Sequence, residues 1–232
     1  MSSKDVTIEG KDGSFYGYLA APASGKGPGI VVIQEIFGVN KVMRDLADGF
    51  AARGYFALAP DLFWRIEPGV QLTDQTDDEW KKAFDLMNKF EHDPGIADIQ
   101  SSIDFLRATP GCTGKVGAVG YCLGGLLAYL AAARTDSDAS VGYYGVNIDQ
   151  KLDEAKDIEH PLMLHIAGKD GFQKPEQRAK IIEGLKGNRH VTLHLYPEMD
   201  HAFARAGGAH YDHANAELAN GRTATFFRQH LS

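Results

Sequence analysis

The residue best suited to covalent chemistry is a cysteine set between glycines, in the segment GYCLGG that runs from Gly120 to Gly125. This G-x-C-x-G pattern follows a short strand pattern and precedes a leucine- and alanine-rich segment that favours a helix. A glycine-flanked residue between a strand and a helix is expected in a sharp turn that lifts its side chain to the helix N-terminus. The helix dipole favours a thiolate there, so Cys122 is predicted to be a nucleophile rather than an inert buried cysteine.

Two residues that could assist a cysteine nucleophile follow later apolar segments of the chain. Asp170 and His201 each come directly after a strand pattern. The chain order Cys122, Asp170, His201 is nucleophile, acid and histidine, which is the order of α/β-hydrolases. The imidazole accepts the thiol proton and later protonates the leaving group, while the carboxylate holds the imidazole in the required tautomer. Asp200 is the alternative acid, but a sequence neighbour rarely reaches Nδ1 of the adjacent histidine.

Backbone N–H groups are expected to stabilise the oxyanion formed during acyl transfer. One donor is assigned to Leu123, directly after the cysteine, and the other to Ile36 in the loop after the third predicted strand. Glu35 precedes Ile36 and is therefore expected near the active centre, where a buried unpaired carboxylate would be costly. The structural alternative for Glu35 is a helix-start acid or an ion-pair partner.

Length and composition restrict the class of protein. The chain has 232 residues, 44% hydrophobic and 24% charged, which suits one large soluble α/β domain over residues 1–232. A net charge of −7 without a basic run argues against nucleic acid as a partner. No apolar run approaches membrane-spanning length, and the first residues show no secretory signal. Two cysteines make no disulfide framework, so a cytoplasmic protein is expected.

The pattern of apolar segments predicts alternating strands and helices. Strands are expected at residues 6–8, 15–19, 29–34, 55–59, 115–119, 140–145, 162–167 and 191–196. Helices are expected at residues 40–53, 79–90, 96–107, 126–133, 175–185 and 211–230, with an irregular segment at 62–78. Such alternation predicts a mostly parallel sheet with helices on both faces, whose chemistry gathers beyond the carboxyl ends of the strands.

The remaining histidines are expected to be structural. His165 and His194 fall inside strand patterns and are predicted to be packed. His210 and His213 have a spacing that could suit a metal ion, but no cluster of cysteines or carboxylates supports one. Neither a metal nor a cofactor is therefore expected.

Four segments together resemble the dienelactone hydrolase, or carboxymethylenebutenolidase, family. They are QEIFGVN at 34–40, GYCLGG at 120–125, VGYYGV at 141–146 and HAFAR at 201–205. The resemblance covers nearly the whole chain. It implies a single-domain cytosolic α/β-hydrolase, usually a monomer. It also implies hydrolysis of an unsaturated, carboxylate-bearing lactone to maleylacetate during the breakdown of chlorinated aromatic compounds.

The resemblance also implies roles for particular residues. Cys122, Asp170 and His201 would form the triad. Glu35 matches a glutamate that contacts the thiol and helps to activate it when substrate arrives. Arg205 matches an arginine that binds the substrate carboxylate.

The sequence departs from the family pattern at positions that concern substrate contact. Trp80 stands where a second carboxylate-binding arginine is expected, and the adjacent Lys81 or Lys82 could replace it. Phe84 stands in place of a tyrosine, and Ala202 in place of a serine. The expected substrate contacts are Arg205, Trp80, Lys81, Phe84, Tyr144, Ala202 and Phe37.

These departures leave the triad intact, so the leading prediction is a cysteine hydrolase of a carboxylate-bearing lactone. A broader carboxylesterase or thioesterase that has lost the strict pocket is the alternative within enzymes. A lactone receptor is a third class, which differs from both by its lack of repeated turnover. In every case the expected partner is a small lactone or ester.

Overall fold

The computed structural model describes residues 2–232, which form two compact units. The first comprises the described residues up to Ala118, and the second comprises Val119–Ser232. Strand β5 (Cys112–Tyr121) runs across the boundary between them. A single domain over residues 1–232 therefore stays a prediction.

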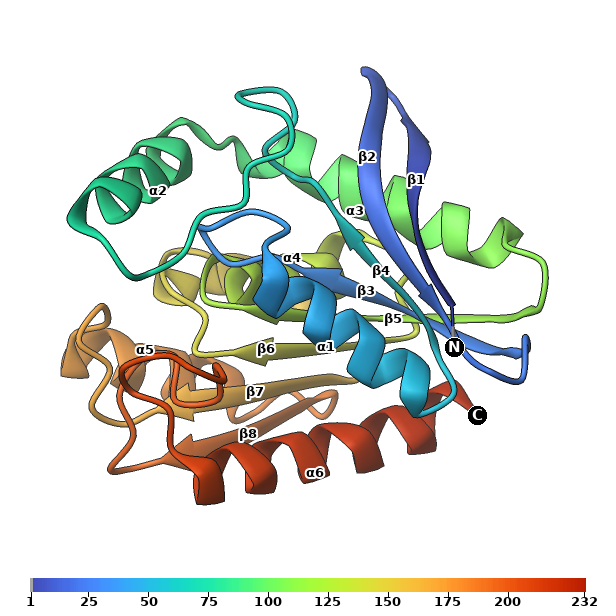
Figure 1. The fold of residues 1–232 in the computed structure, drawn as a ribbon. Coiled ribbons are helices and arrows are strands. Elements are labelled where there is room, and N and C mark those ends of the chain that lie inside the picture. Colours follow the sequence, from blue (N-terminus) through green and yellow to red (C-terminus); the bar gives the residue numbers. More distant parts are fainter. Residues whose placement is uncertain (1) are drawn as a thin grey trace. The chain divides into compact units, whose positions relative to one another are not determined.

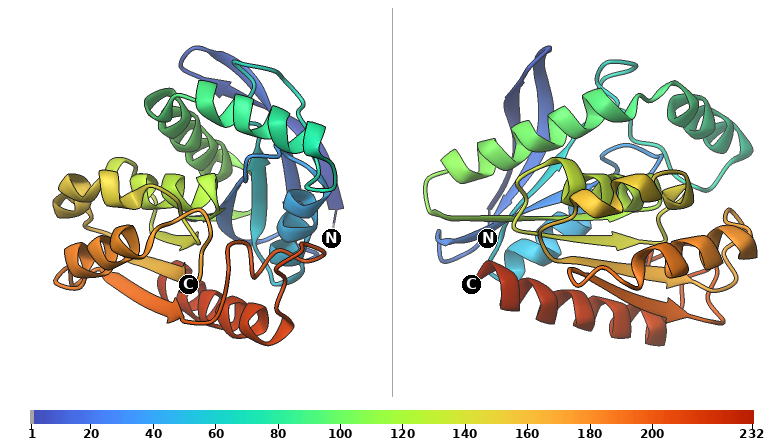
Figure 2. Two further views of the ribbon diagram at one scale, coloured as in Figure 1. Left: turned by 90° about the vertical axis from the view of Figure 1, so that its left-hand side faces the viewer. Right: turned by 180° about the vertical axis from the view of Figure 1, so that it is seen from behind.

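The first unit is built from an antiparallel hairpin followed by alternating strands and helices. In chain order it contains β1 (Ser2–Gly10), β2 (Gly13–Ala21), β3 (Gly27–Ile33), α1 (Lys41–Ala52), β4 (Phe56–Pro60), α2 (Asp77–Lys89), α3 (His92–Ala108) and the first part of β5. The strands are hydrogen-bonded in the order β1-β2-β4-β3-β5; β3 and β4 are parallel, and β2 is antiparallel to both β1 and β4. Helices α1 and α3 lie on opposite faces of these strands (Figures 1 and 2).

The loop between β3 and α1 is held in place by the buried strand before it and the capped helix after it. Residues of β4 are all buried, as are nearly all of β3, which is the pattern of strands covered on both faces. Helix α1 begins after Asn40, whose side chain accepts a hydrogen bond from the N–H of Met43 at 3.2 Å. Its apolar stripe of Met43, Ala47 and Phe50 is buried. The loop between β3 and α1 is thus held at both ends.

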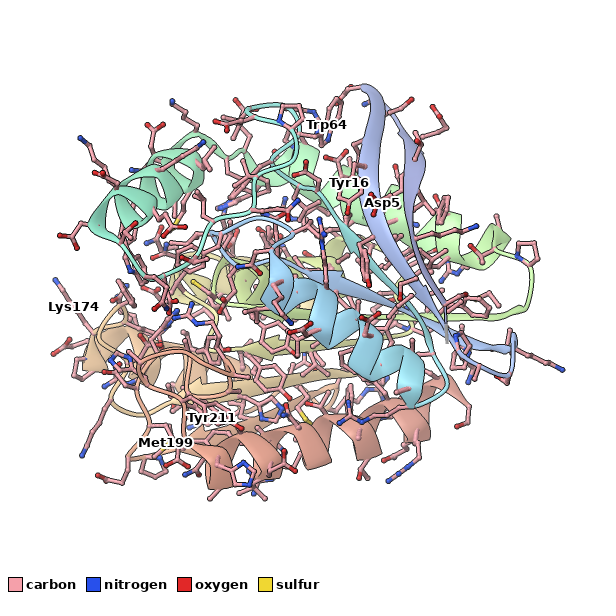
Figure 3. The ribbon with its side chains drawn as sticks, in the orientation of Figure 1. Asp5, Tyr16, Trp64, Lys174, Met199 and Tyr211 are labelled. Atoms are coloured by element: carbon pink, nitrogen blue, oxygen red, sulfur yellow. The ribbon has the colours of Figure 1, made fainter. Side chains whose placement is uncertain are left out.

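The irregular segment before α2 is tied to the rest of its unit by a buried carboxylate. The side chain of Asp98, on α3, is 1% exposed and accepts a hydrogen bond from Trp64 Nε1 at 2.8 Å. Arg65 pairs with Asp98, with Nη2 3.0 Å from Oδ1, and also with Asp12 at 2.8 Å. Figure 3 labels Trp64, near the tip of the β1–β2 hairpin. Moving Arg65 away would leave the buried charge of Asp98 without a partner, which costs free energy, so the ion pair restrains the segment.

The second unit continues the alternation. It contains the end of β5, α4 (Leu123–Arg134), β6 (Ala139–Tyr143), the 3₁₀ helices η1 (Ile148–Gln150) and η2 (Leu152–Asp157), β7 (Leu162–Ala167), α5 (Pro175–Leu185), β8 (Val191–Tyr196) and α6 (His213–Leu231). The strand order is β5-β6-β7-β8, and the pairs β6–β7 and β7–β8 are parallel. Helices α4 and α6 lie on opposite faces of these strands (Figures 1 and 2).

The predicted strands and helices are all present, although β1, β2, β5 and α4 are longer than predicted, and two of the other differences in bounds have a local cause. Strands β7 and β8 and helix α5 have the predicted bounds. Helix α3 begins at His92 rather than at residue 96, because Pro94 is tolerated in a first turn, where no N–H partner is needed. Strand β6 ends at Tyr143 rather than at residue 145, because Tyr144 has a φ of 38° and leaves the extended conformation. The two 3₁₀ helices were not predicted.

A buried histidine links β7, β8 and α6, as its position in a strand pattern predicted. His165 is 1% exposed. Its Nδ1 lies 2.8 Å from the hydroxyl of Tyr196, and its Nε2 lies 2.9 Å from Oγ1 of Thr223. Each hydroxyl can donate or accept, so both ring nitrogens of a neutral imidazole are satisfied.

We expect His165 to make the fold less stable in acid. Burial, followed by the charges of His194 and Arg222, holds the pKa of His165 well below 6.5. Below about pH 6.5 the unfolded chain binds a proton that the folded chain does not. The free energy of unfolding should therefore fall there by up to about 1.4 kcal/mol per pH unit from this one group. Urea unfolding between pH 5 and 7.5 measures this slope.

The variants to compare with wild type are His165→Gln and His160→Gln. His160 is exposed, so its replacement should leave the pH slope unchanged. His165→Gln cannot titrate and should flatten the slope, whatever its absolute stability. An unchanged slope in His165→Gln would contradict the assignment.

Candidate active site

Cys122 occupies a strained turn between β5 and α4. Its backbone has φ 57° and ψ −115°, a conformation that non-glycine residues rarely adopt. The N–H of Cys122 donates to the carbonyl of Tyr143 at 3.1 Å. Its carbonyl accepts from Gly125 at 2.9 Å and from Leu126 at 3.3 Å, which starts helix α4. The sulfur is therefore carried by the residue that caps the positive end of a helix.

Close backbone packing around this turn requires glycine at three positions, which we call the glycine seam: Gly120, Gly125 and Gly145. A Cβ on Gly120 would lie 1.9 Å from the carbonyl oxygen of Gly124. A Cβ on Gly125 would lie 2.5 Å from the carbonyl oxygen of Tyr143, and one on Gly145 would lie 2.7 Å from the carbonyl carbon of Gly125. The seam lets α4 approach the strands closely and holds the turn of Cys122 in place.

The structure brings His201 and Asp170 together with Cys122. His201 and Asp170 are both buried, and Nδ1 of His201 lies 2.9 Å from Oδ2 of Asp170. The other oxygen of Asp170 accepts the N–H of Phe172 at 2.9 Å. This arrangement leaves Nε2 of His201 for Cys122, and the two side chains are hydrogen-bonded.

The charges around His201 favour the imidazolium. Burial acts to lower the pKa of His201, but the charge of Cys122, the hydrogen bonds to Asp170 and Cys122, and the charge of Asp170 outweigh it. Together they raise the pKa of His201 from 6.5 to about 10. A proton on this imidazole is thus favoured throughout the neutral range.

Two aromatic rings hold the imidazole from its sides. The ring of Tyr144 lies 5.1 Å from that of His201 at 61°, and the ring of Phe172 lies 4.9 Å away at 73°. Edge-to-face contacts of this kind restrict the rotation of the imidazole. Tyr144 was among the predicted site residues, whereas Phe172 was not. The available signal was its place in the same short loop as Asp170.

Asp200, the alternative acid, does not lie at Nδ1 of His201. One of its oxygens instead accepts the backbone N–H groups of Gly171 and His201. The adjacent Ala202 has a φ of 61°, in the left-handed region. Like Cys122, it is held in a conformation that the surrounding structure must enforce.

The candidate residues of the first unit lie on the loop after β3 and on α2. Glu35, Ile36 and Phe37 are all buried. The ring of Phe37 meets Trp80 edge-on, with centroids 5.0 Å apart, and Trp80 stacks on Phe84 at 5.6 Å. We call Phe37, Trp80 and Phe84 the aromatic cluster.

The candidate cations for a substrate carboxylate have different environments. Lys82 forms an ion pair with Glu67 at 2.5 Å, whereas Lys81 is an exposed residue of α2. In the second unit, the N–H of Arg205 donates to the carbonyl of Ala202 at 2.9 Å. Arg205 thus belongs to the same turn as His201.

Residues 2–232 show neither a metal-binding cluster nor a helix suited to a membrane. These residues contain no group of three or more histidine, cysteine or acidic side chains able to hold a metal ion. They likewise include no helix with the length and apolar character to cross a membrane. Cys112 and Cys122 are both free thiols.

Comparison with known sequences identifies the family. The profile of the dienelactone hydrolase family matches residues 15–231. An Azospirillum brasilense protein with the provisional name carboxymethylenebutenolidase is 53% identical, over 98% of this chain and 99% of its own. The carboxymethylenebutenolidase of Pseudomonas putida is 39% identical, over 97% of this chain and 96% of its own.

Comparison with solved structures confirms the predicted fold. A Klebsiella pneumoniae protein described provisionally as a dienelactone hydrolase has a TM-score of 0.86 and 27% identity, with 98% of each chain covered. A Pyrococcus furiosus esterase has a TM-score of 0.73 at 17% identity, covering 100% of this chain and 94% of its own, and so shares the fold alone. The fold is that of the α/β-hydrolases, and the chain belongs to the dienelactone hydrolase family as a hydrolase of ester bonds.

Proposed function

We propose that the chain hydrolyses the ester bond of a carboxylate-bearing lactone through a Cys122–His201–Asp170 triad and an acyl-enzyme. The observation that carries this proposal is the position of His201, which is hydrogen-bonded to Cys122 on one side and to Asp170 on the other. Nucleophilic catalysis requires a thiol in contact with a base, and an acid that orients the base from its other side.

The first half of the reaction opens the lactone. The Cys122 thiolate attacks the carbonyl carbon, and a carbon–sulfur bond forms. As the tetrahedral intermediate collapses, the ring carbon–oxygen bond breaks and His201 gives its proton to the departing oxygen. In a lactone that oxygen stays attached to the acyl chain, so nothing leaves at this stage.

The second half releases the product and restores the resting state. Neutral His201 takes a proton from water, and the water oxygen bonds to the thioester carbon. The carbon–sulfur bond then breaks, which returns the thiolate and the imidazolium. The net change is one lactone and one water converted to one hydroxy acid, or to its keto tautomer where the ring oxygen was enolic.

Charge stabilisation in both halves is assigned to the backbone. The N–H of Leu123, the first residue of α4, is one oxyanion donor, and the N–H of Ile36 is the other. The dipole of α4 assists the thiolate at the same helix end. Glu35 is assigned to thiol activation. The roles of Ile36 and Glu35 rest on their place directly after β3 and on the family of the chain.

The proposed substrate class follows from the relatives and from Arg205. The Pseudomonas putida relative is a carboxymethylenebutenolidase, and dienelactone is the corresponding lactone with a free carboxylate. Arg205 is assigned to that carboxylate, because it lies in the turn that carries His201. We place the enzyme in the breakdown of aromatic compounds, as a monomer in the cytoplasm, whose reducing conditions suit a catalytic thiol.

The aromatic cluster favours a broader ester or thioester hydrolase as the second candidate. Trp80 stands where the family pattern has an arginine, and its ring packs between Phe37 and Phe84. An indole offers a large apolar contact surface, which suits a neutral or aromatic acyl group better than a second carboxylate contact does.

Removal of Arg205 should separate charged from neutral substrates. A hydrogen bond to a charged group contributes about 1.5–3 kcal/mol. Arg205→Ala is therefore expected to reduce kcat/KM for cis- or trans-dienelactone by about 10- to 150-fold, at 1.36 kcal/mol per tenfold. Neutral aryl esters should be nearly unaffected. Steady-state rates on both substrates test the substrate class.

Two further variants complete this comparison. Arg228→Ala removes an exposed arginine of α6 and should change neither rate. Trp80→Arg should move the preference towards dienelactone if Trp80 lies where substrate binds. Equal losses on both substrates in Arg205→Ala would show a structural arginine and remove the carboxylate assignment.

A further inference from the structure

One carboxylate oxygen joins the loop that carries Asp170 to the loop that carries His201. Oδ1 of Asp200 accepts the N–H of Gly171 at 2.8 Å and the N–H of His201 at 2.6 Å. Gly171 directly follows Asp170, so the two donors belong to the acid loop and the histidine loop. Beside this bridge, the N–H of Lys169 donates to the carbonyl of Met199 at 2.8 Å.

The bridge lies where the backbone needs external support. Ala202, the residue after His201, has a φ of 61°, which costs free energy and persists only when neighbouring contacts enforce it. Asp200 provides such a contact next to Ala202, because its side chain accepts the N–H of His201. Figure 3 labels Met199 and Tyr211 on the connection between β8 and α6 that contains this turn.

Asp200 is ionised under ordinary conditions. Burial acts to raise its pKa, but the hydrogen bonds from His201 and Gly171 and the charges of His210 and His201 outweigh it and lower the pKa. Oδ2 of Asp200 lies 3.7 Å from Nδ1 of His210, which is itself 3.1 Å from the carbonyl of His201. Its two oxygens thus have separate neighbours: Oδ1 holds the two loops, and Oδ2 faces His210.

We propose that Asp200 is a positioning residue of the reaction, which sets the distance between Asp170 and His201 by holding both loops on its Oδ1. The inference rests on the proposed triad. It assigns Asp200 no proton transfer and no contact with substrate. Because the bridge restrains the spacing of the two loops, it also restrains the 2.9 Å contact between Nδ1 of His201 and Oδ2 of Asp170.

The first test compares two replacements of Asp200. Asp200→Ala removes the acceptor, and kcat on an aryl ester should fall by about 10- to 100-fold with KM changed less than threefold, because small misplacements of catalytic groups cost rate. Asp200→Asn keeps an oxygen that can accept both N–H groups and should recover most of kcat. Asp212→Ala is the matched control. It removes a carboxylate that accepts the N–H of Asn215 at the start of α6, and kcat should not change.

The second test does not depend on turnover. The Nδ1 proton of His201 should give a downfield ¹H NMR signal, which should shift or broaden in Asp200→Ala but not in Asp212→Ala or Asp200→Asn. An unchanged signal and kcat within twofold of wild type in Asp200→Ala would overturn the inference. Equal damage in Asp200→Ala and Asp200→Asn would also overturn it, since charge rather than the shared acceptor would then matter.

These outcomes separate the inference from the proposed triad. If Cys122→Ala retained turnover, the triad would fail, while the NMR signal would still report on the bridge. If Cys122→Ala were inactive and Asp200→Ala fully active, only the role of Asp200 would be lost.

Discussion

Replacement of Cys122 by alanine is expected to reduce ester hydrolysis by about 10⁴-fold or more, with the fold intact. The members of a catalytic triad act as a unit, so loss of the nucleophile removes the covalent route and leaves only oxyanion stabilisation and binding. Alanine is also small enough for the turn between β5 and α4. The measurement is kcat/KM on dienelactone and on an aryl ester, beside a circular dichroism spectrum.

Cys112 supplies the matched control for this prediction. It is the other free cysteine, at the start of β5, and Cys112→Ala should retain full activity. A thiol reagent such as iodoacetamide should inactivate the wild type by modifying Cys122. Retained turnover in Cys122→Ala with an unchanged circular dichroism spectrum would contradict the covalent mechanism.

Asp170→Asn is expected to reduce kcat by about 10⁴-fold, which is close to the loss expected for Cys122→Ala. The replacement only exchanges one carboxylate oxygen for an amide nitrogen. The N–H of Phe172 donates to Oδ1 of Asp170, so the carbonyl oxygen of an asparagine would keep that bond. The amide nitrogen would then face Nδ1 of His201 and donate to it. That forces the proton onto Nε2, where the imidazole can no longer accept the thiol proton.

The pH dependence of thiol alkylation provides a second readout for Asp170→Asn. With Asp170 neutral, one contribution that raises the pKa of His201 is lost, so alkylation should require higher pH than in wild type. Asp212→Asn makes the same chemical change at the cap of α6, where asparagine serves equally well, and should match wild type. A loss in Asp170→Asn below about tenfold would show that Asp170 does not set the tautomer.

The sequence predicted those parts of the fold that depend on local pattern. The apolar runs of β3, β4 and β7 could be read as buried strands because a strand covered on both faces shows no alternation. Asp170 and His201 could be proposed as partners because each follows a strand, and parallel strands bring their carboxyl ends to one edge. The α/β-hydrolase fold and the dienelactone hydrolase family are both confirmed.

The features of the site that could not be predicted from the sequence depend on contacts between distant segments of the chain. Phe172 lies beside His201 only because the loop after β7 folds back, and no periodicity encodes that. The bridging role of Asp200 depends on the spacing of two loops separated by 29 residues in the chain. In the same way, Trp80 could be located on a helix, but its packing between Phe37 and Phe84 could not.

The glycine seam restricts how this enzyme can acquire new substrates. Gly120, Gly125 and Gly145 cannot be replaced by any other residue without a backbone shift, because a single added methyl group at each position would collide with backbone atoms. A library that randomises the whole neighbourhood of Cys122 would therefore consist mostly of misfolded clones. A library aimed at Phe84, an exposed residue of α2, would leave both the turn of Cys122 and the contacts of His201 unchanged.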